Sequence, residues 1–330
     1  MSPPKFSHKA LELDAARSCS EIEAAIRDQV TQKLRLRGAV VGLSGGIDSS
    51  VVAALCARAL GPDRVLGIFM PEADSSGETT GLGRSVAKSL GIESVLEDIS
   101  GVLEAAGCYQ RRDDAIRSVL PEYGAGYKSK IVLPGLSERR GYAVNWLVAE
   151  DPRGKEIRVR LTGEAYLGIV AATNFKQRTR KMLEYYHADR KHYAVAGTPN
   201  RLEYDQGFFV KNGDGAADFK PIAHLYKTQV YQLAEYVGIP ADVRSRPPTT
   251  DTYSLPQSQD EFYFSLPHGQ LDLCLYGWNH RIPAADVAAV ADLTEPQVEW
   301  VYRDIEAKRR ATRYLHSKPL LIEDMPEVGV

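Results

Sequence analysis

The stretch VVGLSGGIDSSVV, residues 40–52, joins two apolar runs through two glycines, three serines and a single carboxylate, Asp48. The run 39–43 has no polar side chain, which is typical of a parallel strand covered on both faces. The run 49–60 has the length and composition of a helix and is followed by a Gly-Pro pair. The sequence therefore predicts a buried strand that passes directly into a helix through SGGIDSS.

The same alternation continues on both sides of this stretch. Apolar spacing and glycine stops predict helices at 10–36, 78–90 and 225–238 and strands at 64–71, 94–99 and 193–197. Strands that alternate with helices in this order predict an α/β fold with a doubly wound parallel sheet, of the adenine-nucleotide hydrolase-like kind.

Two regions do not follow this alternation of strands and helices. Residues 157–161 alternate apolar side chains with Arg158 and Arg160, which predicts a β-hairpin at 139–161 laid over the core. Residues 246–271 are rich in proline and threonine without helical spacing, and a loop of this length in a compact protein is usually functional or disordered. We expect one domain over 1–330, with the hairpin as an insertion and a helical C-terminal tail from Thr294.

Composition excludes several classes of function. The 330 residues carry a formal charge of -2, which gives no overall attraction to nucleic acid or to an anionic membrane. The apolar runs are far shorter than the roughly 20 residues of a membrane span, and the N-terminus lacks the apolar core of a secretory signal. The four cysteines are scattered without a C-x-x-C pair, which argues against a zinc site or disulfides and favours reduced thiols in the cytoplasm.

The loop SGGIDSS has the features of an anion cradle. It leads into a helix N-terminus, where backbone N–H groups are unpaired and the helix dipole is positive. Gly45 and Gly46 allow close approach of the backbone, while Ser44, Ser49 and Ser50 add hydroxyl donors. A plain turn capped by serine is the simpler alternative. The lysine of a Walker loop is missing, and Asp48 would repel a phosphate unless a divalent cation lay between them.

SGGIDSS resembles the pyrophosphate-binding loop of the N-type ATP pyrophosphatases, which include the NAD, GMP and asparagine synthetases. The segment AGTPNRLEYDQGFFVKNGDGAADFKPIAHLYKTQ, 196–229, resembles the ammonia-dependent NAD synthetases in detail, and NFKQRTRKMLEYY, 174–186, matches a helix of that family. The resemblance covers about residues 20–255. It implies a ligase that uses ATP and Mg²⁺, adenylates a carboxylate, releases pyrophosphate and then aminates the acyl group with ammonia.

The resemblance also implies roles for individual residues. Asp48 and Glu203 would be magnesium ligands, and Asp48, Asp214 and Lys227 would act in catalysis, with Asp214 as a proton acceptor for ammonium. The ATP site would comprise Ser44, Gly45, Gly46, Ser49, Ser50, Phe69, Met70, Thr198, Lys227 and Thr249, with Phe69 and Met70 near adenine. The deamido-dinucleotide substrate would contact Arg178, Tyr185, Lys211 and Asp214.

Each of these residues also has an ordinary interpretation. Glu203 in a polar loop and Lys227 in the first turn of a helix would be solvated, and KQRTRK would be an exposed helix face. Asp214 in NGDGAAD would be a turn residue.

Several departures from the family pattern fall near the acid substrate. Val170 stands where the family often has an aromatic residue, Pro199 and Leu202 replace smaller residues, and a His-Lys pair becomes His316-Ser317-Lys318. The hairpin and the loop 246–271 have no match in the family pattern. The expected substrate is deamido-NAD, and a ligase for another carboxylic acid is the main alternative. A tRNA-modifying relative is disfavoured by the missing C-x-x-C, and a sensor without catalysis is disfavoured by the intact Asp48, Glu203 and Lys227.

The expected partners follow from the same resemblance. No N-terminal glutaminase domain fits in this length, so ammonia would be free or delivered by a separate glutaminase. By family analogy, helices at 20–36 and 175–187 would form a homodimer interface. No nucleic-acid or membrane partner is expected.

Overall fold

The structure is a computed structural model that describes residues 6–75, 77–133, 145–247, 252–259, 263–264, 266–323, 325 and 327. Thr249, the first part of the predicted hairpin (139–144) and parts of the predicted loop 246–271 lie outside the described residues.

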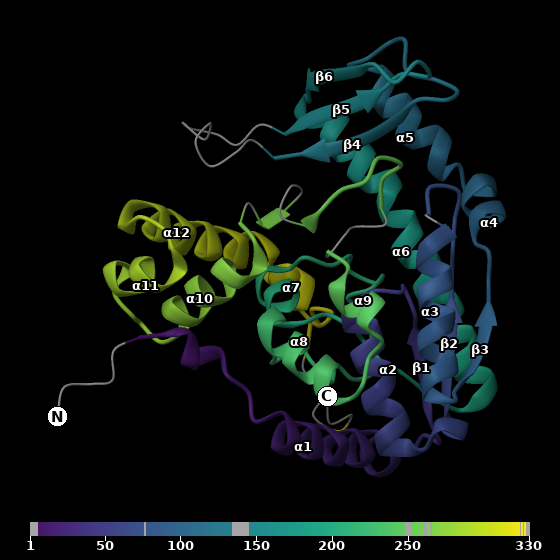
Figure 1. Ribbon diagram of the computed structural model, residues 1–330. Helices are drawn as coiled ribbons and strands as arrows, with labels where there is room; N and C mark the ends of the chain where they lie inside the picture. The colour runs from purple at the N-terminus through teal and green to yellow at the C-terminus, as the bar shows by residue number, and fades with distance from the viewer. Residues whose placement is uncertain are drawn as a thin grey trace.

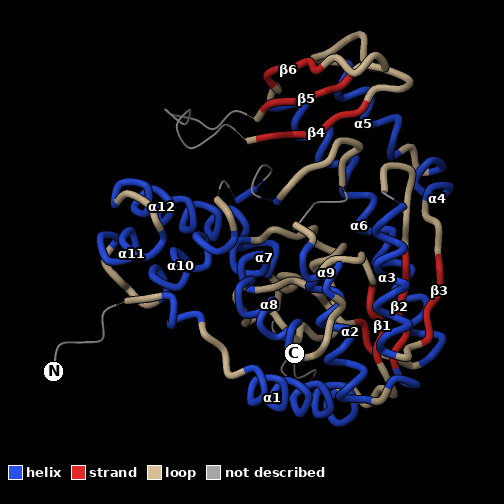
Figure 2. Tube along the Cα trace, in the orientation of Figure 1, coloured by secondary structure: helices blue, strands red, loops and turns tan. Residues whose placement is uncertain are grey.

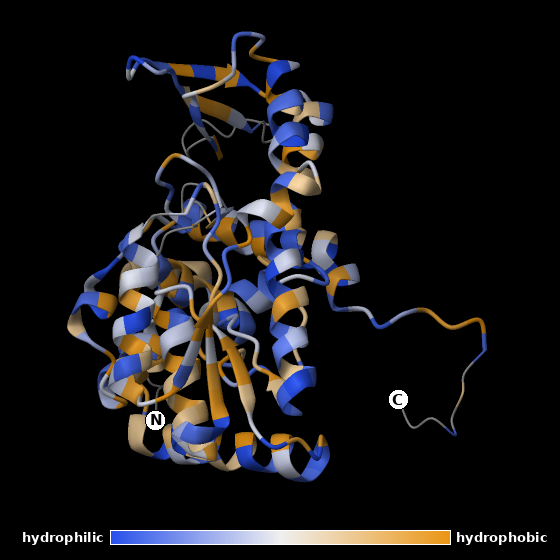
Figure 3. Cartoon of the chain, turned by 90° about the vertical axis from the view of Figure 1, so that its right-hand side faces the viewer, coloured by the Kyte–Doolittle hydropathy of each residue, from blue (hydrophilic) through white to orange (hydrophobic). Residues whose placement is uncertain are grey.

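A four-stranded parallel sheet forms the centre of the molecule, as the sequence predicts. Its strands lie in the order β3 (Glu93–Leu96), β2 (Val65–Phe69), β1 (Ala39–Gly42) and β7 (Ala194–Val195). Figure 2 shows β1, β2 and β3 together beneath a second, separate sheet. In Figure 3 the central strands are largely orange, the hydrophobic end of the scale, because both faces of the sheet are covered. The doubly wound α/β class is thereby confirmed.

The two faces of this sheet are covered by different helices, because successive strand residues point to opposite sides. Val41 packs with helices α1 (Ala15–Arg27), α2 (Ile47–Leu60), α3 (Gly77–Leu90) and α8 (Lys227–Tyr236). Val40 packs with helices α4 (Ser100–Ala105), α5 (Cys108–Arg117) and α6 (Gly163–Lys191). Eleven of the 14 residues of α2 are buried, so this helix is enclosed on nearly every side and holds the loop before it rigidly.

The predicted helix at 10–36 is shorter than expected. A 3-10 turn at His8–Leu11 precedes α1, which begins after Asp14, and a π turn follows at Asp28–Lys33. The Asp14 carboxylate accepts the backbone N–H of Arg17 at 3.0 Å, which caps the helix. The side chain of Gln232 binds the N–H of Leu13 and the carbonyl of Leu11. The apolar spacing continues through Leu11 and Leu13, but the Leu11 carbonyl and the Leu13 N–H bind the side chain of Gln232 instead of α-helical partners.

A second, antiparallel sheet stands at the top of Figure 1. It comprises β4 (Lys128–Val132), β5 (Trp146–Glu150) and β6 (Glu156–Arg160), in that order. The described part of the predicted hairpin is confirmed as β5 and β6, whereas β4 was not expected as its third strand. The sheet is not laid over the main core. It has its own core, in which Ile131 and Leu147 pack with Ile116 of α5 and Ile169 of α6.

The C-terminal part adds helices beside the carboxyl edge of the main sheet. Helices α10 (His268–Asn279), α11 (Ala284–Ala291) and α12 (Glu295–Thr312) form an apolar cluster of their own. The shorter elements are helices α7 (Arg201–Gln206) and α9 (Ala241–Ser245) and the 3-10 turns Pro62–Arg64 and Arg313–His316. Because α10 begins at His268, the predicted loop 246–271 ends earlier than expected. None of the helices among the described residues is both long enough and apolar enough to cross a membrane.

Candidate active site

A cavity of about 540 Å³ opens at the carboxyl ends of β1 and β2. Residues that follow these strands form one wall, α6 forms a second, and residues 203–214 with the start of α8 form a third. Ligands of open α/β sheets bind at this edge, where loops follow the strands.

The SGGIDSS loop is built around its backbone. Gly45 has φ +73°, and a Cβ atom at this position would collide with the carbonyl oxygen of Thr79, so only glycine suits this position. Helix α2 begins at Ile47, with Gly46 as its N-cap. The Ser44 hydroxyl accepts the N–H of Gly46 at 3.3 Å and lies 3.2 Å from the Ser49 hydroxyl. The first turn of α2 and two serine hydroxyls therefore face the cavity together, as the anion-cradle hypothesis requires.

Asp48, Glu203 and Lys227 form a charged centre in which Lys227 is buried and both carboxylates are half-buried. The Lys227 ammonium is ion-paired with Asp48 and its side chain is only 3% exposed. Asn200 also donates to Asp48, at 3.3 Å. Burial alone would lower the pKa of Lys227, but the charges of Asp48 and Glu203 raise it. Lys227 is thus far from an ordinary surface lysine.

Glu203 lies on helix α7 and not in a polar loop as expected. Asn200 caps this helix, and its backbone N–H donates to one Glu203 carboxylate oxygen at 3.1 Å, which completes a capping box. Gln259 donates to the other oxygen at 2.9 Å. Burial, together with the negative charge of Asp48, raises the pKa of Glu203 to about 7, against the opposite effect of Lys227.

The two carboxylates suit a magnesium ion. No group of three or more His, Cys, Asp or Glu side chains that could hold a metal occurs in the part of the chain that the structure describes. Two carboxylates are nevertheless sufficient for Mg²⁺ when phosphate oxygens and water complete its shell. The centre holds two carboxylates and one ammonium, so it carries a net negative charge when Glu203 is ionised, and a divalent cation would offset that charge.

Residues implied for the dinucleotide bind nearby backbone groups. Arg178 donates to the backbone oxygen of Lys211 at 3.3 Å, and the Lys211 ammonium donates to the backbone oxygen of Tyr314 at 2.8 Å. Asp214 accepts the N–H of Val210 at 2.8 Å, and burial raises the pKa of Asp214 despite this bond. Arg178, Lys211 and Asp214 line the same cavity as the charged centre.

The structure thus brings most of the predicted residues together. Those that line the cavity are Ser44, Gly46, Asp48, Ser49, Phe69, Met70, Arg178, Thr198, Glu203, Lys211, Asp214 and Lys227. Gly45 and Ser50 are not on this wall, and the buried Ser50 hydroxyl donates to the Gly46 carbonyl at 2.8 Å. The Tyr185 hydroxyl donates to Asp218 at 3.2 Å, also away from the wall.

Two buried side chains near the site were not anticipated. Asp272, on α10, accepts the N–H of Thr228 at 2.7 Å and that of Lys227 at 3.3 Å, so it caps α8 from another helix. Burial raises the pKa of Asp272 to about 6, against these hydrogen bonds. Lys176, on α6, is 1% exposed and binds Glu72 at 2.9 Å and Asp74 at 2.6 Å. The available signal for Asp272 was a single charge inside the apolar run LDLCLYG.

Comparisons with known proteins identify the family of the chain. The sequence profile of the NAD synthase family matches residues 18–119 and 160–314. An NH3-dependent NAD(+) synthetase of Mesorhizobium japonicum is 62% identical over 317 residues, which are 96% of this chain and 99% of the relative.

Two solved structures share the fold. An NMN synthetase from Francisella tularensis has a TM-score of 0.63 and 18% identity, covering 94% of this chain and 99% of its own. An NH3-dependent NAD synthetase from Campylobacter jejuni has a TM-score of 0.61 and 20% identity, covering 94% of this chain and all of its own. The profile match spans both the SGGIDSS loop and the residues of the charged centre. The chain therefore belongs to the NAD synthase family.

Proposed function

We propose that this protein is an ammonia-dependent NAD synthetase, a ligase that converts deamido-NAD, ATP and ammonia into NAD, AMP and pyrophosphate. The observation that carries the proposal is the cavity that joins the SGGIDSS loop, the Asp48–Lys227–Glu203 centre and the Arg178–Asp214 end in one space. The relative from Mesorhizobium japonicum, which aligns over nearly the whole chain, supports deamido-NAD over another carboxylic acid.

The residues near the loop are arranged to bind the triphosphate. Ser44, Gly46 and Ser49 would donate to the β- and γ-phosphates, and Lys227 would place a compact cation beside them. Asp48 and Glu203 would hold Mg²⁺, which offsets the charge of the phosphates and favours departure of pyrophosphate. Phe69 and Met70, at the end of β2, would contact the adenine.

The other end of the cavity would bind the acid. Arg178 and Lys211 would hold the dinucleotide so that its carboxylate oxygen attacks the α-phosphorus of ATP, and pyrophosphate leaves as the P–O bond breaks. Ammonia would then attack the acyl carbon, and AMP leaves with its electron pair. A base must remove the excess proton from the nitrogen, and Asp214 is suited to this because burial raises its pKa.

The decisive assay combines purified protein, ATP, Mg²⁺, ammonium chloride and deamido-NAD. We expect NAD, AMP and pyrophosphate in equal amounts, with ¹⁸O from the substrate carboxylate recovered in AMP. Nicotinate mononucleotide serves as the competing acid, and Asp48→Asn as the inactive control. Formation of ADP and phosphate, or no turnover of deamido-NAD by a protein that still binds ATP, would refute the proposal.

Three further assignments belong to the same proposal. We propose a homodimer, because α6 exposes the apolar side chains of Leu167, Met182 and Tyr186, each more than half exposed. Light scattering at micromolar concentration tests this assignment.

We also propose that residues 1–330 form one functional domain. We further propose that the enzyme works in the reducing cytoplasm, because its four cysteines are free and buried. The ammonia source, free or from a separate glutaminase, would be decided by activity with ammonium alone.

A further inference from the structure

The sheet formed by β4, β5 and β6 lies between the two segments that match the family profile, so the family pattern gives it no role. It is nevertheless closely connected to the active site. Strand β4 is at the edge of this sheet, and its outer backbone groups would otherwise be unpaired. Residues 252–259, which we call the strap, run along this edge.

The strap is bound to β4 through backbone and side-chain groups. The N–H of Ser129 donates to the Ser254 hydroxyl at 2.8 Å, and the carbonyl of Ser129 accepts the N–H of Leu255 at 3.2 Å. The Gln257 side chain donates to the carbonyl of Ile131. In addition, the Lys130 ammonium donates to the carbonyl of Pro256 at 3.1 Å. The strap thus binds the inserted sheet over several consecutive residues.

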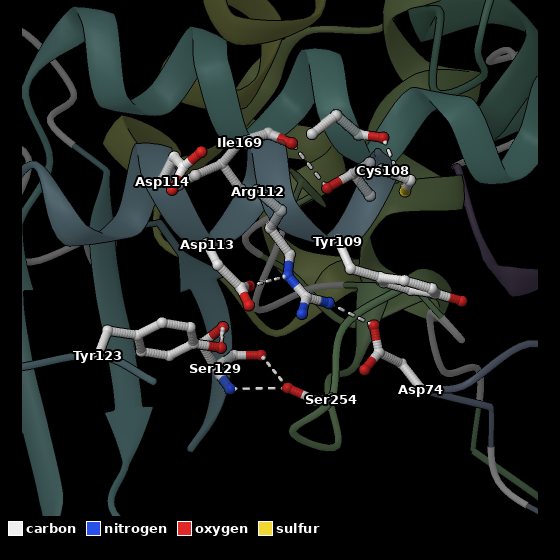
Figure 4. A network of polar contacts seen from close by, with 12 residues as sticks. Asp74, Cys108, Tyr109, Arg112, Asp113, Asp114, Tyr123, Ser129, Ile169 and Ser254 are labelled. Atoms are coloured by element: carbon white, nitrogen blue, oxygen red, sulfur yellow. Dashed lines mark hydrogen bonds and ion pairs between the residues drawn. The ribbon is translucent and has the colours of Figure 1, made fainter. Parts of the chain in front are cut away.

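The beginning of the strap is bound to the main body of the protein. Lys176 donates to the carbonyl of Thr252 at 2.9 Å while it also binds Glu72 and Asp74. Arg112 of α5 donates to Asp74 at 2.6 Å and to Asp113 at 2.9 Å. Figure 4 shows the contacts of Arg112 with Asp74 and Asp113, together with the neighbouring contacts of Ser129 with Tyr123 and Ser254. Two elements therefore bind the strap directly, β4 and α6, while α5 and the loop after β2 contribute through the ion pairs that surround Lys176.

The other end of the strap reaches the charged centre. Gln259 donates to one Glu203 oxygen at 2.9 Å, and the backbone of Asn200 donates to the other at 3.1 Å. With both oxygens bound, the plane of the carboxylate is fixed relative to Asp48 and Lys227. The Asn200 contact is local to α7, whereas the Gln259 contact depends on where the strap is held.

We propose that the inserted sheet is a positioning element for Glu203: β4 holds the strap in place, and Gln259 at the end of the strap orients the carboxylate. The inference rests on the proposed function in taking Glu203 to be a metal ligand. Gln259, Ser254 and Gln257 are positioning residues, because they act through Glu203. The role belongs to this chain's insertion and to relatives that share it.

The test compares three proteins. Gln259→Ala removes the contact with Glu203, while Ser254→Ala/Gln257→Leu removes the side-chain contacts of Ser254 and Gln257 with β4 with little change in volume. The third protein combines all three changes. Lys128→Ala and Arg160→Ala are the controls, since both residues are exposed on the same sheet and, among the described residues, make no hydrogen bond to the strap.

The first readout is Mn²⁺ binding, measured by electron paramagnetic resonance in the presence of a non-hydrolysable ATP analogue. A hydrogen bond to a charged group contributes enough that losing it should weaken Mn²⁺ binding about tenfold. We expect this loss in Gln259→Ala and in the strap variant, with no further loss in the combined protein. The controls should match the wild type. The second readout is kcat, which should fall with Mn²⁺ affinity while the KM for the acid changes less than twofold.

The outcomes separate the two proposals. Mn²⁺ binding does not involve the acid substrate, so it decides the role of the insertion even if deamido-NAD is not turned over. Unchanged Mn²⁺ affinity in the strap variant would overturn the positioning role. The positioning role would also be overturned if the separate losses of Mn²⁺ affinity multiplied in the combined protein, because effects that act through one common contact do not add. A lower melting temperature alone, with normal Mn²⁺ affinity, would reduce the insertion to a purely structural element.

Discussion

Replacing Lys227 with methionine tests the electrostatics of the charged centre. Met keeps most of the side-chain volume but removes the only cation that is hydrogen-bonded to Asp48 among the described residues. Breaking a buried ion pair usually costs about 3–5 kcal/mol, because the remaining charge stays buried. Here the remaining charges are two carboxylates, so the cost should depend on pH.

The sign of this dependence follows from the pKa of Glu203. In the wild type it lies at about 7, above its ordinary 4.5, so the folded state favours the protonated form and stability falls as pH rises between these values. Removal of Lys227 raises the pKa of Glu203 further, because the attraction that opposed the shift is lost. Above pH 7 the folded variant therefore retains a proton that the wild type has released. Its stability should decrease by up to about 1.4 kcal/mol per pH unit relative to the wild type.

Urea denaturation in EDTA measures the effect. We expect Lys227→Met to lose about 2 kcal/mol at pH 6 and about 4 kcal/mol at pH 8.5. The double variant Asp48→Asn/Lys227→Met is the matched control, because it removes both the Asp48 charge that raises the pKa of Glu203 and the Lys227 charge that lowers it, so its loss of stability relative to the wild type should depend little on pH. An equal loss at both pH values, or an unchanged slope in the double variant, would refute the reasoning.

The remaining predictions concern the loop, the cap and the thiols. Gly45→Ala should weaken ATP binding, measured by calorimetry, at least tenfold, because the positive φ and the Thr79 carbonyl force the loop to move. The control Gly81→Ala, in α3, should leave ATP binding unchanged and increase the free energy of unfolding by about 0.5–1 kcal/mol. Asp272→Asn should lower the free energy of unfolding by about 1–2 kcal/mol, through loss of a charged cap of α8, and equal stability in urea would contradict this. Burial raises the pKa of the Cys56 and Cys274 thiols to about 12. Ellman's reagent at pH 8 should therefore label the native protein slowly, and it should label all four cysteines after unfolding. Rapid labelling of the native protein would contradict the burial of these thiols.

Local pattern was sufficient where a residue's role is set by its immediate neighbours in the chain. The run 39–43 indicates a buried strand, and the two glycines of SGGIDSS indicate its turn, because the conformation of both depends on nearby residues. The 196–229 segment placed Glu203 in the site through resemblance, but its local setting was misjudged. Asn200 caps a helix there, and the three-residue spacing from Asn200 to Glu203 is the capping-box signal that was overlooked.

Long-range contacts were beyond the reach of the pattern. Gln232 binds the backbone of Leu11 and Leu13, where the predicted first helix was expected to begin, from more than 200 residues away, and Asp272 caps α8 from a different helix. Gln259 meets Glu203 only because the strap is bound to β4, and nothing near Gln259 in the sequence indicates this pairing. Side chains of this kind are placed by tertiary structure, so only a three-dimensional arrangement reveals their partners.

The position of β7 also bears on how the protein is made. On the ribosome the chain emerges from its N-terminus, so β1, β2 and β3 are exposed well before α6 and β7 have been synthesised. Strand β1 acquires its second neighbour only when Ala194 and Val195 arrive. Until then it presents an apolar edge that can pair with other nascent chains. Because the inserted sheet lies between β3 and β7 in the chain, the time needed to translate it prolongs this state.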